Sequence, residues 1–430
     1  MNTTLKAADI LLPGKDIDQR KWSVVACDQF TSQPEYWEKV ESIVGNAPSC
    51  YRMIFPEVYL EEKDKEERIQ TINETMKKYE QNGIFETYEN AMIYVERTDS
   101  EGNVRAGIVA CFDLEDYDYH KGSSSLIRAT EATVESRIPP RVKIRQNAIV
   151  ELPHIMILID DPEKTVIEPL EGEKNKLNKL YDYDMMLGGG HNVGYLLGEK
   201  EQNKVLEAIA CLKNQENFNA RYGVENLPVL LFAMGDGNHS LATAKAYYEQ
   251  LKAEHPDQDL SQHPARYALA ELVNLHSPAL EFEAIHRIVT DVDVEDLMLC
   301  LKKELKLSTT ESQTTKEKLL GLQSFEIMES GQARRVWIGN PSSTLTVGSL
   351  QNFLDAYLKE KGGKIDYIHG RDVMESLTQQ KDSVGFLLPD MKKSELFPTV
   401  IADGALPRKT FSMGHAPDKR YYMECRKIVY

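Results

Sequence analysis

A short polar turn near the middle of the chain combines residue types suited to acid–base and phosphate chemistry. It consists of Gly235-Asp236-Gly237-Asn238-His239-Ser240, between an apolar run and a stretch of good helix formers. Glycines allow a sharp turn and a close approach of backbone to ligand. The helix start offers unpaired amides and a positive dipole end, which favour an anion. Asp236 and His239 add a carboxylate and an imidazole for acid–base work or ion coordination.

A purely structural role for this turn remains open, in which Asp236 or Ser240 caps the helix and His239 is exposed. In the functional interpretation, the other members of the turn contact a phosphate. They are Gly235, Gly237, Asn238 and Ser240.

Residues 122–141 form a second unusual segment, because they gather hydroxyl groups and arginines in an acidic chain without helical or strand periodicity. Arginine forks suit phosphates and carboxylates, and hydroxyl groups complete such a shell. We expect anion binding here, and the alternative is an exposed loop whose arginines pair with acidic neighbours. The candidate contacts are Arg128, Thr130, Glu131, Arg137 and Arg141.

Three further groups are weaker candidates. The glycine-rich turn at 187–194 has neither P-loop nor dinucleotide spacing, so it favours a lid or tight turn, with His191 and Asn192 as contacts if it binds a ligand. His286-Arg287 and Arg408-Lys409 are ordinary surface pairs by themselves. Cys27 precedes Asp28 and is either a catalytic thiol or a small buried hydrophobe.

Composition excludes several classes of protein. The net charge of −17 is a poor fit to nucleic-acid binding, which depends on basic side chains. No run approaches the roughly 20 apolar residues that cross a bilayer, and the N-terminus lacks signal-peptide features. The six cysteines show no CxxC pair, which argues against a zinc site or disulfide framework. We therefore expect a cytoplasmic protein with no membrane or nucleic-acid partner, and the sequence leaves its oligomeric state open.

Hydrophobic patterns predict alternating strands and helices, and hence an α/β fold with a mixed sheet; α+β is the alternative. Expected helices cover 62–81, 200–214, 240–254 and 350–360. Expected strands cover 22–26, 92–97, 104–112, 154–159, 228–234, 384–388 and 398–402. Residues 267–275 and 279–289 look like a further pair of strands, and helix is an equal alternative for 267–275. We divide the chain into an N-terminal region (1–150), a core with the polar turn (151–335) and a C-terminal region that closes the site (336–430).

The polar turn resembles the Asp-Gly-His-His-Arg signature of a bacterial family known as domain of unknown function 1015. Counterparts follow in the expected order at Ala26-Cys27-Asp28, at 280–287 and at 406–411, so the resemblance spans nearly the whole chain. Asn238 and Ser240 stand where the signature has a His and the Arg. The resemblance lifts His286, Arg287, Arg408 and Lys409 to candidates for closing the pocket.

The same signature is similar to the strand–turn–helix motif of the ParB/sulfiredoxin-like superfamily, whose members bind nucleotide or phosphate at this turn and include free-serine kinases. This similarity implies a ParB/sulfiredoxin-like core with elaborations. It matches Asp236 to the turn Asp, His239 to its second His, and Asp28 to an acid from an earlier loop. In those kinases the two acids serve the hydroxyl acceptor.

The function we favour is phosphoryl transfer on a small hydroxylated metabolite, with free serine or phosphoserine as candidates and the kinase or phosphatase direction open. Asp236 or Asp28 would orient or deprotonate the hydroxyl, while His239, the helix amides and the arginines of 128–141 would hold the phosphoryl group. The donor would be a nucleotide or pyrophosphate, with Mg²⁺ as the expected ion. One alternative is a ParB-like nucleotide-binding regulatory module without substantial turnover, and another is a metabolite-binding regulator.

Overall fold

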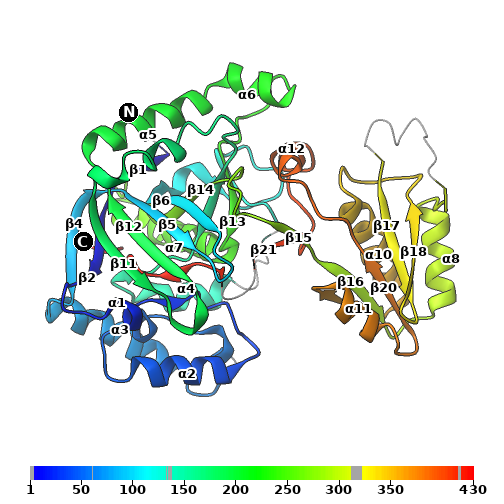
Figure 1. Cartoon of the computed structure of the whole chain (residues 1–430), viewed down its shortest axis with the longest axis horizontal. Helices are drawn as coiled ribbons and strands as arrows, with labels where there is room; N and C mark the ends of the chain where they lie inside the picture. The colour runs from blue at the N-terminus through cyan, green and yellow to red at the C-terminus, as the bar shows by residue number, and fades with distance from the viewer. Residues whose placement is uncertain (1–3, 61, 132, 134–137, 311–321, 415–417) are drawn as a thin grey trace. The chain divides into compact units, whose positions relative to one another are not determined.

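The chain forms two compact units in a computed structural model that describes residues 4–60, 62–131, 133, 138–310, 322–414 and 418–430 (Figure 1). Unit 1 comprises Met1–Ala129, Thr133–Leu280 and Gly414–Tyr430, and unit 2 comprises Thr130–Ala132 and Glu281–Met413. Unit 2 is thus largely an insertion into unit 1. This division differs from the three regions expected from the sequence, because strands from 1–150 and from 151–280 share one sheet.

Unit 1 is built on a ten-stranded mixed sheet of order β11-β12-β5-β6-β14-β10-β13-β8-β7, with β1 paired to β6. Strand β10 is parallel to β14 and antiparallel to β13, and this mixture confirms the α/β class with a mixed sheet. The strands are β1 (Leu5–Lys6), β5 (Ile93–Thr98), β6 (Val104–Asp113), β7 (Tyr117–Asp118), β8 (Ile127–Arg128), β10 (Met156–Ile159), β11 (Asn178–Asp184), β12 (His191–Leu196), β13 (Phe232–Asp236) and β14 (Tyr267–Asn274).

The central strands are apolar because they are buried on both faces. All residues of β10 and β14 are buried, as are the first three of β13. The alternating runs at 92–97 and 104–112 form the expected strands β5 and β6, which pair as an antiparallel hairpin. Local patterns of this kind were sufficient to predict these strands.

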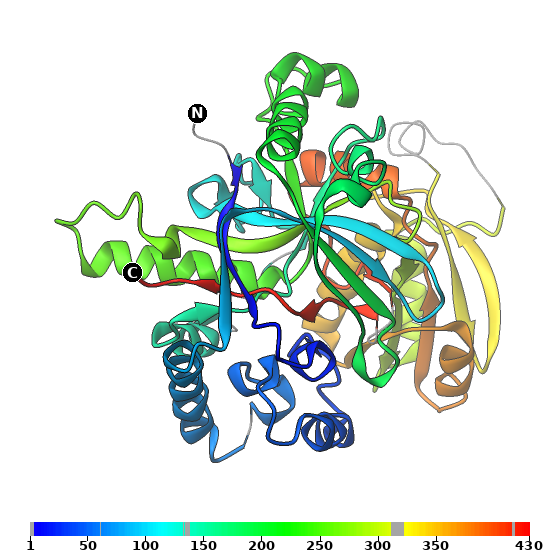
Figure 2. The same ribbon diagram turned by 60° about the vertical axis from the view of Figure 1, so that its left-hand side comes forward.

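Helices and three short two-stranded sheets complete unit 1. The helices are α1 (Gln19–Trp22), α2 (Pro34–Val44), α3 (Lys65–Gln81), α4 (Ile138–Gln146), α5 (Glu199–Leu212), α6 (Gln215–Tyr222) and α7 (Asn238–Glu254). The short sheets pair β2 (Ala8–Pro13) with β4 (Phe85–Ala91), β3 (Val24–Val25) with β22 (Tyr421–Tyr422), and β9 (Val150–Glu151) with β23 (Arg426–Lys427). The C-terminal segment, red in Figure 2, therefore runs beside strands from the N-terminal part.

A buried charge network ties this C-terminal segment to the sheet. Glu271 of β14 is fully buried and bonds Arg420 Nη1 at 2.5 Å and Arg105 Nε at 3.3 Å. Arg420 Nη2 also donates to Glu424 at 2.7 Å. Burial raises the pKa of Glu271, but Arg105 and Arg420 outweigh it and hold the pKa below its usual value. The carboxylate is therefore ionised inside the protein.

Unit 2 contains a five-stranded antiparallel sheet of order β18-β17-β20-β16-β19 and a separate pair, β15 with β21. The strands are β15 (Phe282–Ala284), β16 (His286–Thr290), β17 (Ser324–Glu329), β18 (Gln332–Trp337), β19 (Lys364–Ile368), β20 (Ser383–Leu387) and β21 (Phe411–Met413). The helices are α8 (Val294–Glu304), α10 (Thr346–Lys361), α11 (Arg371–Leu377) and α12 (Lys393–Asp403).

One expectation for this part of the chain was wrong. The strand expected at 398–402 is part of α12, which contains Pro398; Leu396 and Val400, four residues apart, are both buried, so helical burial decides the structure. Both strands expected at 267–275 and 279–289 are present, and they lie in different sheets, since β14 belongs to unit 1 and β16 to unit 2.

Within the part of the chain that the structure describes, no helix is both long and apolar enough to cross a membrane.

Candidate active site

The polar turn has the predicted strand–turn–helix geometry. Strand β13 ends at Asp236, Gly237 adopts a left-handed conformation (φ 81°), and α7 begins at Asn238. A Cβ atom on Gly237 would lie 3.0 Å from Ile155 Cα, so this position needs glycine for its conformation and for its close approach to the neighbouring strand.

Among the described residues, no side chain caps α7. Asp236 Oδ1 instead accepts a hydrogen bond from Gly237 N at 2.9 Å, and the first intrahelical bond runs from Leu241 N to Gly237 O at 3.0 Å. The first-turn amides, which include those of Asn238 and Ser240, precede that bond and have no intrahelical acceptor. Neither Asp236 nor Ser240 therefore caps α7 as the purely structural alternative requires.

His154 lies at the same edge of the sheet as Asp236. Strand β10 runs antiparallel to β13, with Met156 opposite Asp236, so the residues that lead into β10 meet the end of β13. His154 Nε2 is 3.2 Å from Ser240 Oγ and 3.4 Å from Asp28 Oδ2. This imidazole joins the polar turn to the N-terminal loop.

Asp28 and His154 perturb each other's protonation. Burial lowers the pKa of His154, but Asp28, and beyond it Asp236 and Glu57, outweigh burial and raise the pKa above its ordinary value. Burial raises the pKa of Asp28, but the charge and hydrogen bond of His154, with Gln29 and Lys419, hold it well below its usual range. The pair therefore favours the protonated imidazole of His154 facing the ionised carboxylate of Asp28.

The C-terminal segment supplies two further side chains. Lys419 Nζ lies 3.2 Å from Asp236 Oδ2 and is 15% exposed. Its backbone carbonyl accepts a hydrogen bond from Arg97 Nη1 at 2.6 Å. Tyr422 Oη lies 2.8 Å from His154 Nδ1 and accepts a hydrogen bond from Cys27 N at 3.2 Å. Two carboxylates, an imidazole and an ammonium therefore meet at the start of α7.

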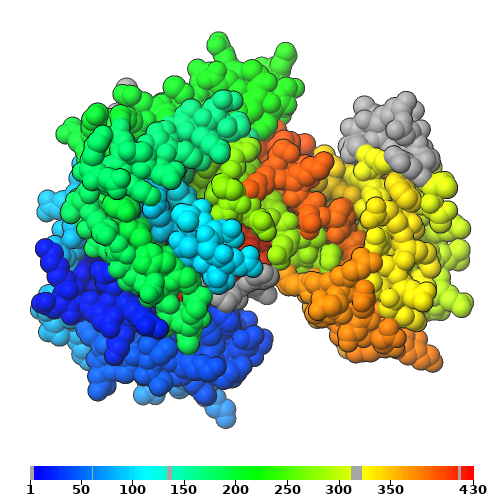
Figure 3. Space-filling model, viewed as in Figure 1, coloured from blue at the N-terminus to red at the C-terminus, as the bar shows by residue number. Residues whose placement is uncertain are grey.

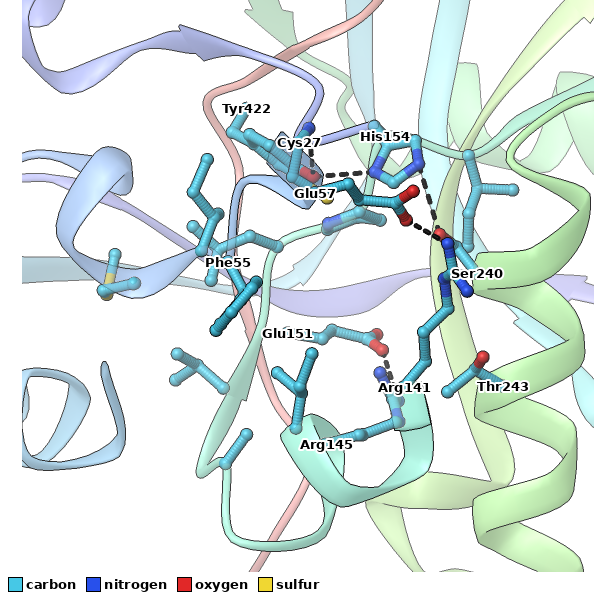
Figure 4. A pocket seen from close by; sticks show the side chains of 18 of the residues that line it. Cys27, Phe55, Glu57, Arg141, Arg145, Glu151, His154, Ser240, Thr243 and Tyr422 are labelled. Atoms are coloured by element: carbon cyan, nitrogen blue, oxygen red, sulfur yellow. Dashed lines mark hydrogen bonds and ion pairs between the residues drawn. The ribbon is translucent and has the colours of Figure 1, made fainter. Parts of the chain in front are cut away.

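A cavity of about 170 Å³ adjoins this cluster (Figure 4). His154, Ser240 and Tyr422 form part of its wall, together with Arg141, whose guanidinium pairs with Glu57. Arg141 is the one residue of the 122–141 segment that the structure places on this cavity among those described.

Cys27 also lines the cavity, but its chemistry does not favour catalysis. Burial, with the neighbouring Asp28 charge, raises the pKa of the thiol far above its ordinary value. Because the thiolate is the nucleophilic form, this environment disfavours a catalytic thiol, and the side chain is half-buried.

Three other predicted contacts in unit 1 have structural partners. Arg128 donates to the backbone oxygens of Ser125 and Pro228, at 2.8 and 2.9 Å. His191 and Asn192 lie in β12, in the hairpin with β11 that is green on the surface in Figure 3. His191 contacts Asp184 and Asp182, and Asn192 Nδ2 donates to Tyr183 Oη at 3.1 Å.

The remaining candidates belong to unit 2, where they form a group of their own. Arg287 is fully buried, stacks over the Tyr367 ring and donates from Nη2 to Arg408 O at 3.0 Å. Burial lowers the pKa of Arg287 to about 10.

The neighbouring candidates are tied into the same unit. Glu131 Oε1 accepts from Thr410 N at 3.4 Å, and Lys409 has a φ of 56°. Thr130 O accepts from Leu406 N at 2.7 Å. His286 Nδ1 accepts from Leu388 N at 3.2 Å. Arg137 lies outside the described residues.

Sequence reasoning missed three residues of the site: His154, Lys419 and Tyr422. His154 was assigned only to the apolar run of a strand, because the antiparallel order of β10 and β13 leaves no local signal. Lys419 and Tyr422 lie just beyond the tail segment 406–411 that was singled out, in a stretch without a motif.

A resident metal ion finds no dedicated ligand set among the described residues, where no group of three or more His, Cys, Asp or Glu side chains is arranged to hold one. Mg²⁺ often uses one or two carboxylates and completes its shell with phosphate oxygens and water. Asp28 and Asp236 are the carboxylates of the cluster, and each is paired with a cationic side chain, His154 and Lys419.

Fold and site define a mixed α/β protein with a polar strand–turn–helix motif. The family model described as "Protein of unknown function (DUF1015)" matches residues 11–398, so the chain belongs to this family. No curated protein matches the sequence.

Solved structures give distant similarities. A free serine kinase in complex with AMP is 11% identical, with 75% of this chain and 91% of that chain covered and a TM-score of 0.36. A conserved hypothetical protein from Pyrococcus furiosus is 10% identical (71% and 90% covered, TM-score 0.35). SbnI with C-terminal truncation from Staphylococcus aureus is also 10% identical (73% and 82% covered, TM-score 0.34).

Proposed function

We propose that unit 1 transfers a phosphoryl group between a nucleotide or pyrophosphate donor and the hydroxyl group of a small metabolite. The observation that carries this proposal is the cluster of Asp28, Asp236, His154 and Lys419 at a helix N-terminus without a side-chain cap. A ParB/sulfiredoxin-like core, and free serine as a first candidate acceptor, follow from the resemblance of the turn and belong to the same proposal.

The charges of the cluster suit the demands of phosphoryl transfer. The first-turn amides of α7, the Lys419 ammonium and the protonated His154 stabilise the charge on the transferring group. Asp236 orients the acceptor hydroxyl, and Asp28 holds His154 in its charged form. Because Asp28 has a lowered pKa, it is a weak base; a loose transition state needs positioning and charge stabilisation more than strong base catalysis.

In the forward direction, the acceptor oxygen forms a bond to the terminal phosphorus while the bond from that phosphorus to the bridging oxygen breaks. The acceptor proton leaves by way of Asp236, and the donor departs with one phosphoryl group fewer: the nucleoside diphosphate from ATP, the monophosphate from ADP, or inorganic phosphate from pyrophosphate. The same groups acting with water would release phosphate from a phosphomonoester, such as phosphoserine. A bound Mg²⁺ would neutralise phosphate charge.

Phosphorus NMR on the full-length protein tests this function. Serine and phosphoserine are each incubated with ATP, ADP or pyrophosphate and Mg²⁺, and we expect a new phosphorus signal that disappears in Asp236→Asn. Asp184→Asn, an exposed carboxylate on β11, is the matched control and should leave the signal unchanged.

Full activity in Asp236→Asn would contradict the assignment of the site. Broadened nucleotide signals without any product would favour the nucleotide-binding module instead.

A further inference from the structure

The cavity beside His154 is large enough for an organic molecule. Its volume of about 170 Å³ exceeds by roughly tenfold the ~15 Å³ that one buried water requires. An engineered apolar cavity of ~150 Å³ in another protein binds benzene. A space of this size therefore accommodates an apolar group with about six heavy atoms.

Most of the cavity wall is apolar. It is formed by side chains from the loop that includes Cys50–Met53, from α3 and from the approach to β10. They include Met53, Phe55, Leu60, Met76, Leu152 and Ile155.

The polar side chains in this part of the wall are already bonded within the protein. Glu151 Oε2 accepts from Arg145 at 2.6 Å, and Glu151 Oε1 accepts from Arg426 at 2.9 Å. Thr243 Oγ1 donates to His239 O at 2.7 Å. A polar ligand would find few partners here, whereas an apolar one would gain about 25 cal/mol for each Å² removed from water.

The opposite end of the cavity is polar and reactive. Figure 4 shows His154, Ser240, Glu57 and Arg141 gathered there, with His154 bonded to both Ser240 and Tyr422. His154 Nε2 also faces Asp28 Oδ2. One molecule could therefore place a hydroxyl group beside His154 and Ser240 and an apolar group in the chamber.

We propose that this cavity binds the apolar body of the acceptor, so that the substrate is a small alcohol with an aromatic or branched aliphatic group about the size of benzene. Free serine, the first candidate acceptor named above, has only a hydroxymethyl side chain and would leave the apolar chamber unfilled, so the cavity favours a bulkier acceptor in its place. The reaction of the hydroxyl group rests on the proposed function, but binding in the cavity does not.

Saturation-transfer NMR on the full-length protein tests the binding, with 2-phenylethanol as the probe and glycerol as a hydroxyl compound without an apolar body. We expect saturation transfer to 2-phenylethanol and none to glycerol. Ala148→Leu fills the cavity and Leu60→Gln makes its wall polar. Each should weaken binding about tenfold, as expected for the loss of one or two buried methylene contacts.

Ala220→Leu and Leu299→Gln make the same changes at exposed positions and should leave binding unchanged. Circular dichroism checks that each variant is folded, and two different cavity variants guard against the loss of one through misfolding. Two results would overturn the proposal. One is the absence of saturation transfer to 2-phenylethanol in the wild type, and the other is saturation transfer as strong as that of the wild type in both folded cavity variants.

Phosphorus NMR on the same samples separates the two proposals. Cavity-dependent binding without phosphoryl transfer to any hydroxyl compound would leave the cavity assignment in place and remove the proposed reaction. Phosphorylation of serine without binding of 2-phenylethanol would support the proposed reaction and remove the cavity assignment.

Discussion

At the scale of single residues, the pair of Asp28 and His154 explains how a buried imidazole remains charged. His154 is 6% exposed, and burial alone would favour its neutral form. The carboxylate 3.4 Å away reverses that preference. The protonation of this pair should therefore control both stability and phosphate binding.

We predict a pH-dependent stability that originates from this pair. The raised pKa of His154 stabilises the fold fully below the unfolded pKa of about 6.5, and this contribution is lost as pH rises through the folded pKa. The lowered pKa of Asp28 contributes above about pH 3.9 and is lost as pH falls through its folded value. The pair is thus most stabilising between about pH 4 and 6.5.

Thermal unfolding from pH 5 to 9 should show a decline on the alkaline side that is reduced in His154→Gln. His255→Gln removes an exposed histidine and should keep the wild-type profile. If the unfolding temperatures of the wild type and of His154→Gln changed with pH in the same way, the Asp28–His154 pair would not be the origin of the pH dependence.

Cys27 gives a second prediction at this scale. Because burial and Asp28 raise the pKa of its thiol, iodoacetamide at pH 8 should label the exposed Cys211 and leave Cys27 unmodified, as read by mass spectrometry of peptides. Cys27→Ala should retain phosphoryl transfer within about twofold of wild type, since no step uses the thiol. Rapid labelling of Cys27 together with loss of transfer in the alanine variant would restore the catalytic-thiol alternative.

At the scale of elements, the turn between β13 and α7 depends on Gly237. Gly237→Ala introduces both an unfavourable φ of 81° and a Cβ close to Ile155 Cα, so we expect a loss of about 2–3 kcal/mol in unfolding free energy and loss of phosphoryl transfer. Gly223 also has a positive φ, but a Cβ there meets nothing within 4 Å. Gly223→Ala should cost about 1 kcal/mol and leave transfer intact.

Urea unfolding and phosphorus NMR measure the two effects. Equal losses of stability and of activity in the two glycine variants would contradict this explanation. They would show that the close approach of Gly237 to Ile155 has no effect beyond that of a positive φ.

The same turn shows how far sequence predicts this site. An apolar strand, a Gly-Asp-Gly turn and a run of helix formers follow one another directly in the sequence. Because this pattern is local, it predicts the turn and the position of Asp236. His154 could not, because its position depends on β10 running antiparallel to β13, a pairing that no residue near His154 encodes. The helix α12 was mistaken for a strand because its β-branched residues next to Pro398 outweighed the helical spacing of its buried side chains.

At the scale of the whole molecule, Glu271 joins distant parts of the chain. It lies in β14 and bonds Arg105 of β6 and Arg420 of the C-terminal segment. Removal of one partner from a buried ion pair leaves an uncompensated charge, which costs about 3–5 kcal/mol. We therefore predict that Glu271→Gln lowers the unfolding free energy by about that amount.

Glu329→Gln is the control for an exposed ion pair, because Glu329 pairs with Arg334 at an exposed position. This substitution should lower the unfolding free energy by less than about 1 kcal/mol. Urea denaturation followed by circular dichroism measures both values. Similar losses in the two variants would show that the buried network contributes no more than a surface pair.

The division into two units was beyond the reach of sequence patterns. No Pro-, Gly- or Ser-rich linker marks Leu280 or Gly414, where the chain leaves and re-enters unit 1. The sequence patterns on either side of Leu280 both predict strands, so they do not mark a boundary. Only long-range packing assigns them to different sheets.

The insertion also sets the order in which the site can form during synthesis. A ribosome makes Asp28 early and then His154 and Asp236, but it must complete all of unit 2 before it reaches Lys419 and Tyr422. Until then a nascent chain holds Asp236 without its ammonium partner and His154 without its tyrosine. The cluster is therefore assembled only after translation has passed the insertion, and a truncated translation product would carry the recognisable turn without a complete site.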